Sequence, residues 1–187
     1  MLVVLLLAAC TSSKDDGMSK DTTPTTTDLD PLDLGERLPA GVARAGQVTD
    51  ESVLFGGISA EGRAGDFKIY NDRVQFAIQG VRDGSYYLSE GGGVLDADIV
   101  RPEGHAGHDL VDEWGPMFGL GRILVPDTVE VLSDGRDGGA AIVRVTGIEG
   151  GLGLLEGLLE VEGITPDLGL EIVTEYILQP DSWLLEV

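Results

Sequence analysis

From Ala40 onward, apolar residues recur mainly at every second position, which is the period of a β-strand and not of a helix. Turns rich in Gly, Asp and Asn separate these alternating segments at a spacing of roughly 8 to 12 residues, and no helical pattern intervenes. Such a pattern is typical of antiparallel two-sheet or barrel folds. The sequence therefore predicts an all-β antiparallel sandwich over residues 41–187, either complete or part of a larger, supersandwich-like sheet assembly.

Two hairpins are the clearest local predictions. In the first, residues 67–70 and 73–79 flank Asn71-Asp72, a pair that tolerates the positive φ of a tight turn. In the second, residues 128–132 and 140–146 flank the Gly-rich and Asp-rich segment 133–139. The pattern further predicts a strand over 168–178, shorter strands at 94–95 and 123–125, and a mixture of strand and loop over the Gly-interrupted segment 152–159.

Composition limits how such a sandwich can be stabilised. Aromatic residues make up only 5% of the chain and 28 of its 187 residues are Gly, so Val, Leu, Ile and Ala must supply most of the core. The single cysteine, Cys10, lies far from the predicted sandwich, which therefore has neither a disulfide nor a thiol ligand for zinc. We expect packing to hold the domain together.

The chain begins with an apolar run that ends in Ala8, Ala9 and Cys10. The run is too short to cross a membrane as a helix, and it predicts a signal peptide over residues 1–9. Leu7-Ala8-Ala9-Cys10 resembles the lipobox of bacterial lipoproteins, which implies cleavage before Cys10 and acylation of its thiol. The following residues, 10–40, are rich in Thr and Asp and bury little, so a disordered linker is expected there.

The lipobox resemblance implies an address in the cell envelope, with the membrane as a partner through the lipid anchor. Thr11 follows the cysteine where an Asp would resemble a signal for inner-membrane retention, so the outer membrane is favoured. No Lys or Arg precedes the apolar run, and the chain ends in the strand-like segment 182–187. The first feature predicts that the true start lies upstream, and the second predicts that the sandwich is truncated at its C-terminus, so that the chain is a fragment of a longer protein.

The formal net charge of −21, from 33 acidic and 12 basic side chains, repels phosphate backbones. Nucleic acid is therefore excluded as an expected partner. The sequence contains no Gly-x-Ser-x-Gly motif and no second cysteine, so neither a serine elbow nor a cysteine nucleophile is indicated.

Three segments, 65–78, 91–98 and 134–139, resemble an uncharacterised β-rich module at the start of large bacterial surface lipoproteins. The likeness extends over about residues 50–187 and rests on strand and turn patterns. The resemblance implies that, in some of these lipoproteins, a metallohydrolase or carbohydrate-binding-like domain follows the module. It transfers no catalytic residue to this chain.

Both histidines of the chain lie in one short segment, as His105 and His108, followed by Asp109. Two imidazoles and a carboxylate are common ligands of zinc and iron, so these three residues are a candidate site for a divalent metal. The alternative is an exposed polar loop, because His-x-x-His within a Gly-rich loop does not fix both rings on one face. On that alternative the protein has no cofactor.

Two further patterns are candidates for ligand binding. Asp96 and Asp98 alternate along a predicted strand and share a face, where they either bind a ligand or Ca²⁺ or accept hydrogen bonds from the neighbouring glycine loop. Trp114, near Met117 and Phe118, either forms a platform for a sugar ring or belongs to the core. Asp134-Gly135-Arg136-Asp137-Gly138 resembles part of a calcium loop without its terminal Glu, and a hairpin turn explains it better.

These observations predict an envelope-anchored lipoprotein whose sandwich is a non-catalytic binding or spacer module, with a glycan or another surface protein as its partner. The alternative is the N-terminal domain of a metal-dependent or carbohydrate-active hydrolase that uses His105, His108 and Asp109.

Overall fold

The computed structural model describes residues 32–84, 88, 90–118, 121–153 and 168–187, which form one compact unit from Leu32 onward. The predicted signal peptide, Cys10 and most of the predicted linker lie outside the described residues, as does most of segment 152–159. Within the described part, no helix is long and apolar enough to cross a membrane.

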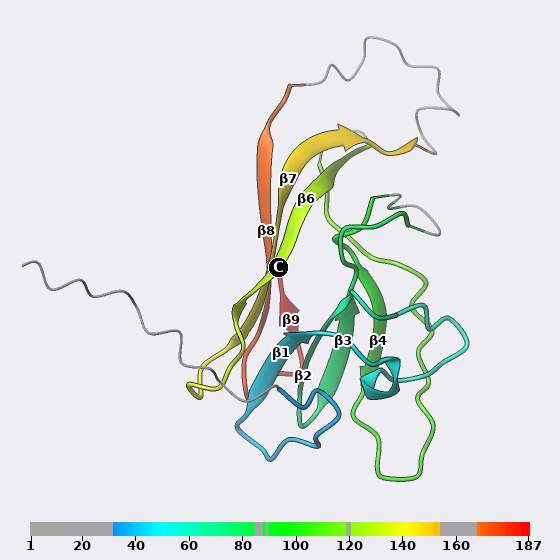
Figure 1. Ribbon diagram of the computed structural model, residues 1–187, viewed down its shortest axis with the longest axis vertical. Coiled ribbons are helices and arrows are strands. Elements are labelled where there is room, and N and C mark those ends of the chain that lie inside the picture. Colours follow the sequence, from blue (N-terminus) through cyan, green and yellow to red (C-terminus); the bar gives the residue numbers. More distant parts are fainter. Residues whose placement is uncertain (1–31, 85–87, 89, 119–120, 154–167) are drawn as a thin grey trace, which may run out of the picture. The chain divides into compact units, whose positions relative to one another are not determined.

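The fold is all-β and consists of two antiparallel sheets, as the sequence predicts (Figure 1). The four-stranded sheet has the order β1-β2-β3-β4, and the five-stranded sheet has the order β5-β6-β7-β8-β9, so each sheet is a meander. The elements are β1 (Ala43–Gln47), a 3-10 turn η1 (Glu51–Val53), β2 (Phe67–Asn71), β3 (Val74–Ile78), β4 (Val94–Ile99), β5 (Met117–Phe118), β6 (Arg122–Ser133), β7 (Ala141–Gly151), β8 (Glu171–Leu178) and β9 (Leu185–Glu186).

The two predicted hairpins are confirmed as β2–β3 and β6–β7. In the first, Asn71 ends β2, and its Oδ1 accepts hydrogen bonds from the backbone N–H groups of Arg73 and Val74. In the second, Gly135 and Gly138 adopt positive φ in the turn. The separate strand expected at 123–125 is instead the first part of β6, which passes Pro126 through a shift in register before Thr128. A proline is tolerated there because a bulge removes the need for its missing N–H.

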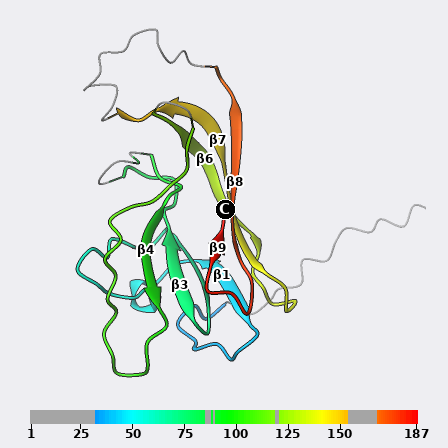
Figure 2. The ribbon, with the colours of Figure 1, turned by 180° about the vertical axis from the view of Figure 1, so that it is seen from behind.

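The two sheets share one aliphatic core with few aromatic side chains, as the composition predicts. Its buried members are Ala43, Ala45, Phe67, Ile69, Val74, Ile78, Val94, Leu124, Ala141, Val143, Val145, Tyr176 and Leu178. Contributions from both sheets to one cluster make this a sandwich-like packing of sheet on sheet. The turn that follows β8 lies beside the β1–β2 end of the smaller sheet (Figure 2), where Asn71 Nδ2 donates to the carbonyl oxygens of Gln179 and Ser182.

The folded unit starts earlier than the boundary at residue 41 that the sequence predicts. Leu34 and Leu38 are buried and form a second apolar cluster with Val48 and Tyr70 on the outer face of the four-stranded sheet. Two leucines within a polar stretch are therefore enough to attach this segment to the sheet. This segment therefore buries part of the outer face of the four-stranded sheet.

Candidate functional site

The outer face of the four-stranded sheet carries a row of polar side chains across all of its strands. The register places Arg44 of β1 opposite Tyr70 of β2, Tyr70 opposite Gln75 of β3, and Gln75 opposite Asp98 of β4. Side chains alternate along a strand, so residues two positions apart lie on the same face. Lys68, two positions before Tyr70, therefore shares this face. The inner face of the same strands holds the apolar core, so the polar row is the opposite half of the alternation.

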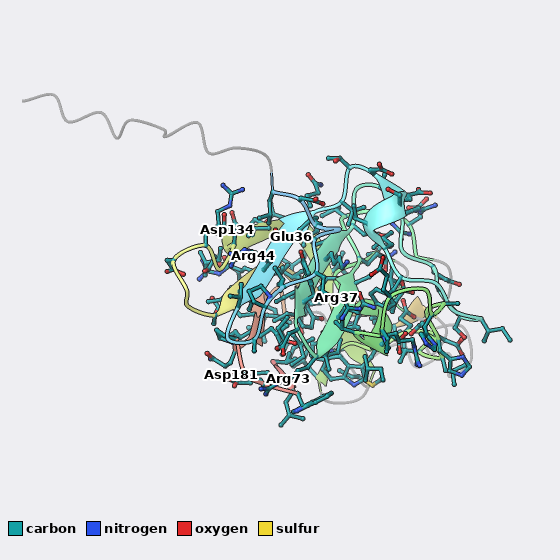
Figure 3. The ribbon with its side chains drawn as sticks, turned by 90° about the horizontal axis from the view of Figure 1, so that it is seen from below. Glu36, Arg37, Arg44, Arg73, Asp134 and Asp181 are labelled. Atoms are coloured by element: carbon teal, nitrogen blue, oxygen red, sulfur yellow. The ribbon has the colours of Figure 1, made fainter. Side chains whose placement is uncertain are left out.

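A pocket of about 310 Å³ lies on this face, and we call it the sheet-face pocket. Its walls come from segment 35–38, η1 and the residues after it, β2, β3 and the loop after β4. The polar side chains that line it include Arg37, Lys68, Tyr70, Gln75, Arg101 and His105. Seen from below, Arg37 lies over the strands of the four-stranded sheet, with Glu36 nearby (Figure 3). The volume is at the small end of the range for ligand pockets.

Lys68, on β2, forms hydrogen bonds with two segments that border the sheet-face pocket. Its Nζ donates hydrogen bonds to the carbonyl oxygens of Leu34, at 2.9 Å, and Val53, at 2.6 Å. The same nitrogen lies 4.4 Å from the centre of the Tyr70 ring, a distance that allows a cation–π contact. Burial lowers the pKa of Lys68 to about 8, although the nearby Asp33 carboxylate acts in the opposite direction.

Tyr70 is buried beside Lys68, and its hydroxyl donates a hydrogen bond of 3.3 Å to the carbonyl oxygen of Asp33. Burial, together with the Glu36 and Asp33 carboxylates, raises the pKa of Tyr70 to about 12, although Arg44 acts in the opposite direction. The phenol is therefore neutral over the physiological range and can contribute a ring face and a hydroxyl to the pocket, but no charge.

Arg101 lines the pocket, and Asp98 of β4 holds it in place. The guanidinium donates two hydrogen bonds of 2.8 and 2.9 Å to the Asp98 carboxylate, which also accepts a hydrogen bond from the backbone N–H of His108. These bonds keep the pKa of Asp98 below its ordinary value, although burial opposes them. Arg37 donates a hydrogen bond to the carbonyl oxygen of Arg101, which connects the N-terminal segment to this wall.

Asp96 and Asp98 share a face of β4, as the sequence predicts, but Asp96 faces a different loop from the one expected. Asp96 is fully buried, and its two oxygens accept hydrogen bonds from the backbone N–H groups of Glu61 and Gly62 at 2.8 and 2.9 Å. Burial raises the pKa of Asp96 to about 6, and the nearby carboxylates of Asp109 and Asp66 raise it too. Asp96 and Asp98 therefore hold loops in place by hydrogen bonds. These loops contain residues 61–62 and 108, and not the glycines at residues 91–93.

The three predicted metal ligands are placed differently from one another. The side chains of His105 and His108 are exposed, and His105 lines the sheet-face pocket. Asp109 is fully buried, and its Oδ1 accepts hydrogen bonds from the backbone N–H groups of Ala97 and Val111. Across the described residues, no three His, Cys, Asp or Glu side chains are grouped so that they could hold a metal ion.

Trp114 joins the four-stranded sheet through its backbone, by a pair of hydrogen bonds with Val94. Its ring is 48% exposed, so it is not a core residue, and Met117 and Phe118 are exposed as well. None of these three residues lines the sheet-face pocket. A sugar platform on Trp114 would thus be a separate, open surface.

Sequence reasoning missed the polar residues of the pocket: Arg37, Lys68, Tyr70 and Gln75. The available signal was the alternation in residues 67–78, which places Lys68, Tyr70 and Gln75 on the face opposite the core. From alternation alone, such a face is expected to be exposed to solvent. That loops cover it depends on contacts between residues far apart in the sequence, such as Lys68 with Leu34.

The fold and this pocket define the chain as a two-sheet, all-β protein with a covered polar face. Comparisons with protein-family models, with curated proteins and with solved structures found no match to the chain. The functional argument therefore rests on the geometry of the site.

Proposed function

We propose that this protein is a lipid-anchored, non-catalytic binding module of the bacterial cell envelope, and that the sheet-face pocket holds its ligand. The observation that carries the binding role is a pocket of about 310 Å³ on a sheet face whose polar side chains are enclosed by loops. A cavity of this size suits a small polar molecule, such as one sugar unit of a glycan, better than the surface of a folded protein.

The side chains in the pocket fit a glycan. Gln75 lines it, is half-buried and makes no side-chain hydrogen bond within the described part of the chain, so its amide can donate to and accept from sugar hydroxyls. Tyr70 supplies an aromatic ring beside it. Lys68 and Asp98 are already engaged with backbone groups or Arg101, and their role is to hold the walls in place.

A glycan array tests the binding role directly. The purified protein is expected to retain a limited set of glycans, and Gln75→Ala is expected to weaken that binding by about tenfold, the loss of one or two neutral hydrogen bonds. Thr128→Ala, an exposed substitution on the five-stranded sheet, is the matched control and should bind as the wild type does. Failure to retain any glycan contradicts the binding role and leaves the spacer role, whereas equal binding by the Gln75 variant contradicts the assignment of the ligand to the sheet-face pocket.

The envelope address rests on the lipobox-like segment that ends at Cys10 and on the polar stretch that follows it. In a bacterial host, an alkyne analogue of palmitate should label the wild type and fail to label Cys10→Ser. Density-gradient separation of the membranes should place the labelled protein in the outer membrane. A mature product that keeps residues 1–9 and has a bare thiol would contradict both the anchor and the address.

The alternative, an N-terminal domain of a metal-dependent or carbohydrate-active hydrolase, is favoured by no observation on the described residues. The resemblance to the β-rich module of large surface lipoproteins agrees with a binding or spacer role and remains a prediction.

A further inference from the structure

Most arginines in the described part of the chain are neutralised by a carboxylate. Salt bridges join Arg73 to Asp72 and Asp181, Arg82 to Asp66, Arg101 to Asp98, Arg122 to Glu149, Arg136 to Asp134, and Arg144 to Glu175. Figure 3 shows one of these pairs, Arg73 with Asp181. Frequent pairing of this kind is expected for a chain with 33 acidic and 12 basic side chains.

Arg37, like Arg44 and Arg63, makes no salt bridge in the described part of the chain, and of these three arginines it is the one that lines the sheet-face pocket. It is exposed and lines the sheet-face pocket, and within the described part of the chain its guanidinium makes one hydrogen bond, to the carbonyl oxygen of Arg101, and no salt bridge. A guanidinium has five N–H donors arranged as a planar fork, so several of those of Arg37 remain available to a ligand. The carbonyl bond holds one end of the fork at the pocket wall.

The charges around the pocket limit the charge that a ligand can carry. Glu36 is the acidic residue among the described residues that line it, whereas Arg37, Lys68 and Arg101 are basic. Asp98 pairs with Arg101, Asp33 acts on Lys68, and Glu36 lies next to Arg37 in the chain, so the three cations are matched by three carboxylates. A pocket that is close to neutral accommodates a ligand with one negative charge better than a dianion such as a phosphate monoester.

We infer that the ligand of the sheet-face pocket is a sugar that carries a carboxylate, and that Arg37 selects it by a bidentate hydrogen-bonded ion pair. Carboxylate geometry matches the guanidinium fork, and a charge-assisted pair of this kind is roughly twice as strong as a neutral hydrogen bond. Gln75, which also lines the pocket, is then available to the hydroxyl groups of the ring. This inference rests on the proposed binding role and names its ligand class.

The test is isothermal titration of the purified protein in detergent with D-glucuronate, D-glucose and D-glucose 6-phosphate. Glucuronate is expected to bind at least about tenfold more tightly than glucose. Arg37→Gln should weaken glucuronate binding by about tenfold to a hundredfold and glucose binding much less, so that the preference for glucuronate is lost, while Arg37→Lys should restore that preference only in part, because an ammonium lacks the fork. Arg63→Gln, an exposed arginine outside the pocket, is the matched control and should behave as the wild type.

The outcomes separate this inference from the proposed binding role. Equal affinity for glucose and glucuronate, or an Arg37→Gln variant with unchanged preference, overturns the carboxylate assignment and leaves the binding role intact. Tighter binding of glucose 6-phosphate than of glucuronate overturns it in favour of a dianion. No binding of any sugar in the titration or on the glycan array overturns the binding role itself. Because Arg37 is exposed, its substitution should leave thermal unfolding unchanged, and a lowered midpoint would show that the side chain is structural instead.

Discussion

Lys68 shows how a single buried charge can set a pH dependence at the scale of one residue. Its pKa falls from 10.5 to about 8 in the folded protein because burial disfavours the ammonium form. Between these two values the unfolded chain binds more protons than the folded chain, so the free energy of unfolding should rise as pH increases from about 8 to about 10.5. Urea titrations at pH 7.5, 8.5 and 9.5 should show this rise in the wild type, and Lys68→Met should lack it. The same slope in both proteins would show that Lys68 titrates normally.

Asp96 should make the free energy of unfolding depend on pH in the acidic range, with the opposite sign to Lys68. Its pKa rises from 3.8 to about 6 on folding, so the folded protein binds the extra proton and its stabilisation is complete below pH 3.8. That contribution should be lost as pH rises through about 6. Arg82, paired with the buried Asp66, and Asp109 are the other charged groups nearby. Stability measured from pH 4 to pH 7 should therefore fall more steeply in the wild type than in Asp96→Asn, even though Asn gives up one backbone hydrogen bond.

Residue roles of this kind were only partly predictable from the sequence. The alternation of Asp96 and Asp98 predicts their common face, and the structure agrees. Asp98 pairs with Arg101, three residues along the chain, but the other partners of the two carboxylates include backbone groups of residues 61, 62 and 108, which no local pattern specifies. Lys68 gave no signal of burial, because a lysine on a polar face is expected to be solvated unless another segment covers it.

At the scale of elements, the pocket wall depends on a close approach of two glycine backbones. A Cβ added at Gly107 would lie 2.6 Å from the backbone nitrogen of Gly56 and nearer still to its carbonyl oxygen. The adjacent bridge between Gly57 and Asp109 holds the two loops together. Gly107→Ala must therefore separate them and should lower the free energy of unfolding by about 1 to 3 kcal/mol, with loss of ligand binding.

The partner glycine provides the matched control for this substitution. A Cβ at Gly56 meets no atom within 4 Å, and its φ is outside the left-handed region, so Gly56→Ala should be close to neutral. Chemical denaturation of both variants checks the pair. Equal destabilisation by the two substitutions would mean that the loops do not approach as closely as they do here.

The elements themselves followed from the sequence wherever the signal was local. Alternation together with turn residues identified β2–β3 and β6–β7, because a tight hairpin is specified by residues next to one another. The continuity of β6 through Pro126 was missed, since a proline usually ends a central strand and only the pairing with β7 shows the bulge. The attachment of Leu34 and Leu38 was missed for the same reason: its partner, Tyr70, lies far along the chain.

At the scale of the whole molecule, Tyr176 connects the two sheets. It is fully buried on β8 of the five-stranded sheet, and its hydroxyl donates a hydrogen bond of 2.8 Å to the carbonyl oxygen of Gly92, in the segment before β4. Gly92 is itself close-packed against the larger sheet, because a Cβ there would lie 2.8 Å from Cγ1 of Val145. The sheets thus meet through backbone as well as through the aliphatic core.

Removing this hydroxyl should weaken both sheets together. Tyr176→Phe leaves the Gly92 carbonyl buried without its donor, so the free energy of unfolding should fall by about 1 to 3 kcal/mol. Because the sheets share one core, the urea transition should remain single and its m-value unchanged. Tyr70→Phe is the control: it removes a longer, 3.3 Å bond that holds only a peripheral segment, and it should have the smaller effect. A larger loss for Tyr70→Phe, or two separate transitions for Tyr176→Phe, would show that the sheets are stabilised independently.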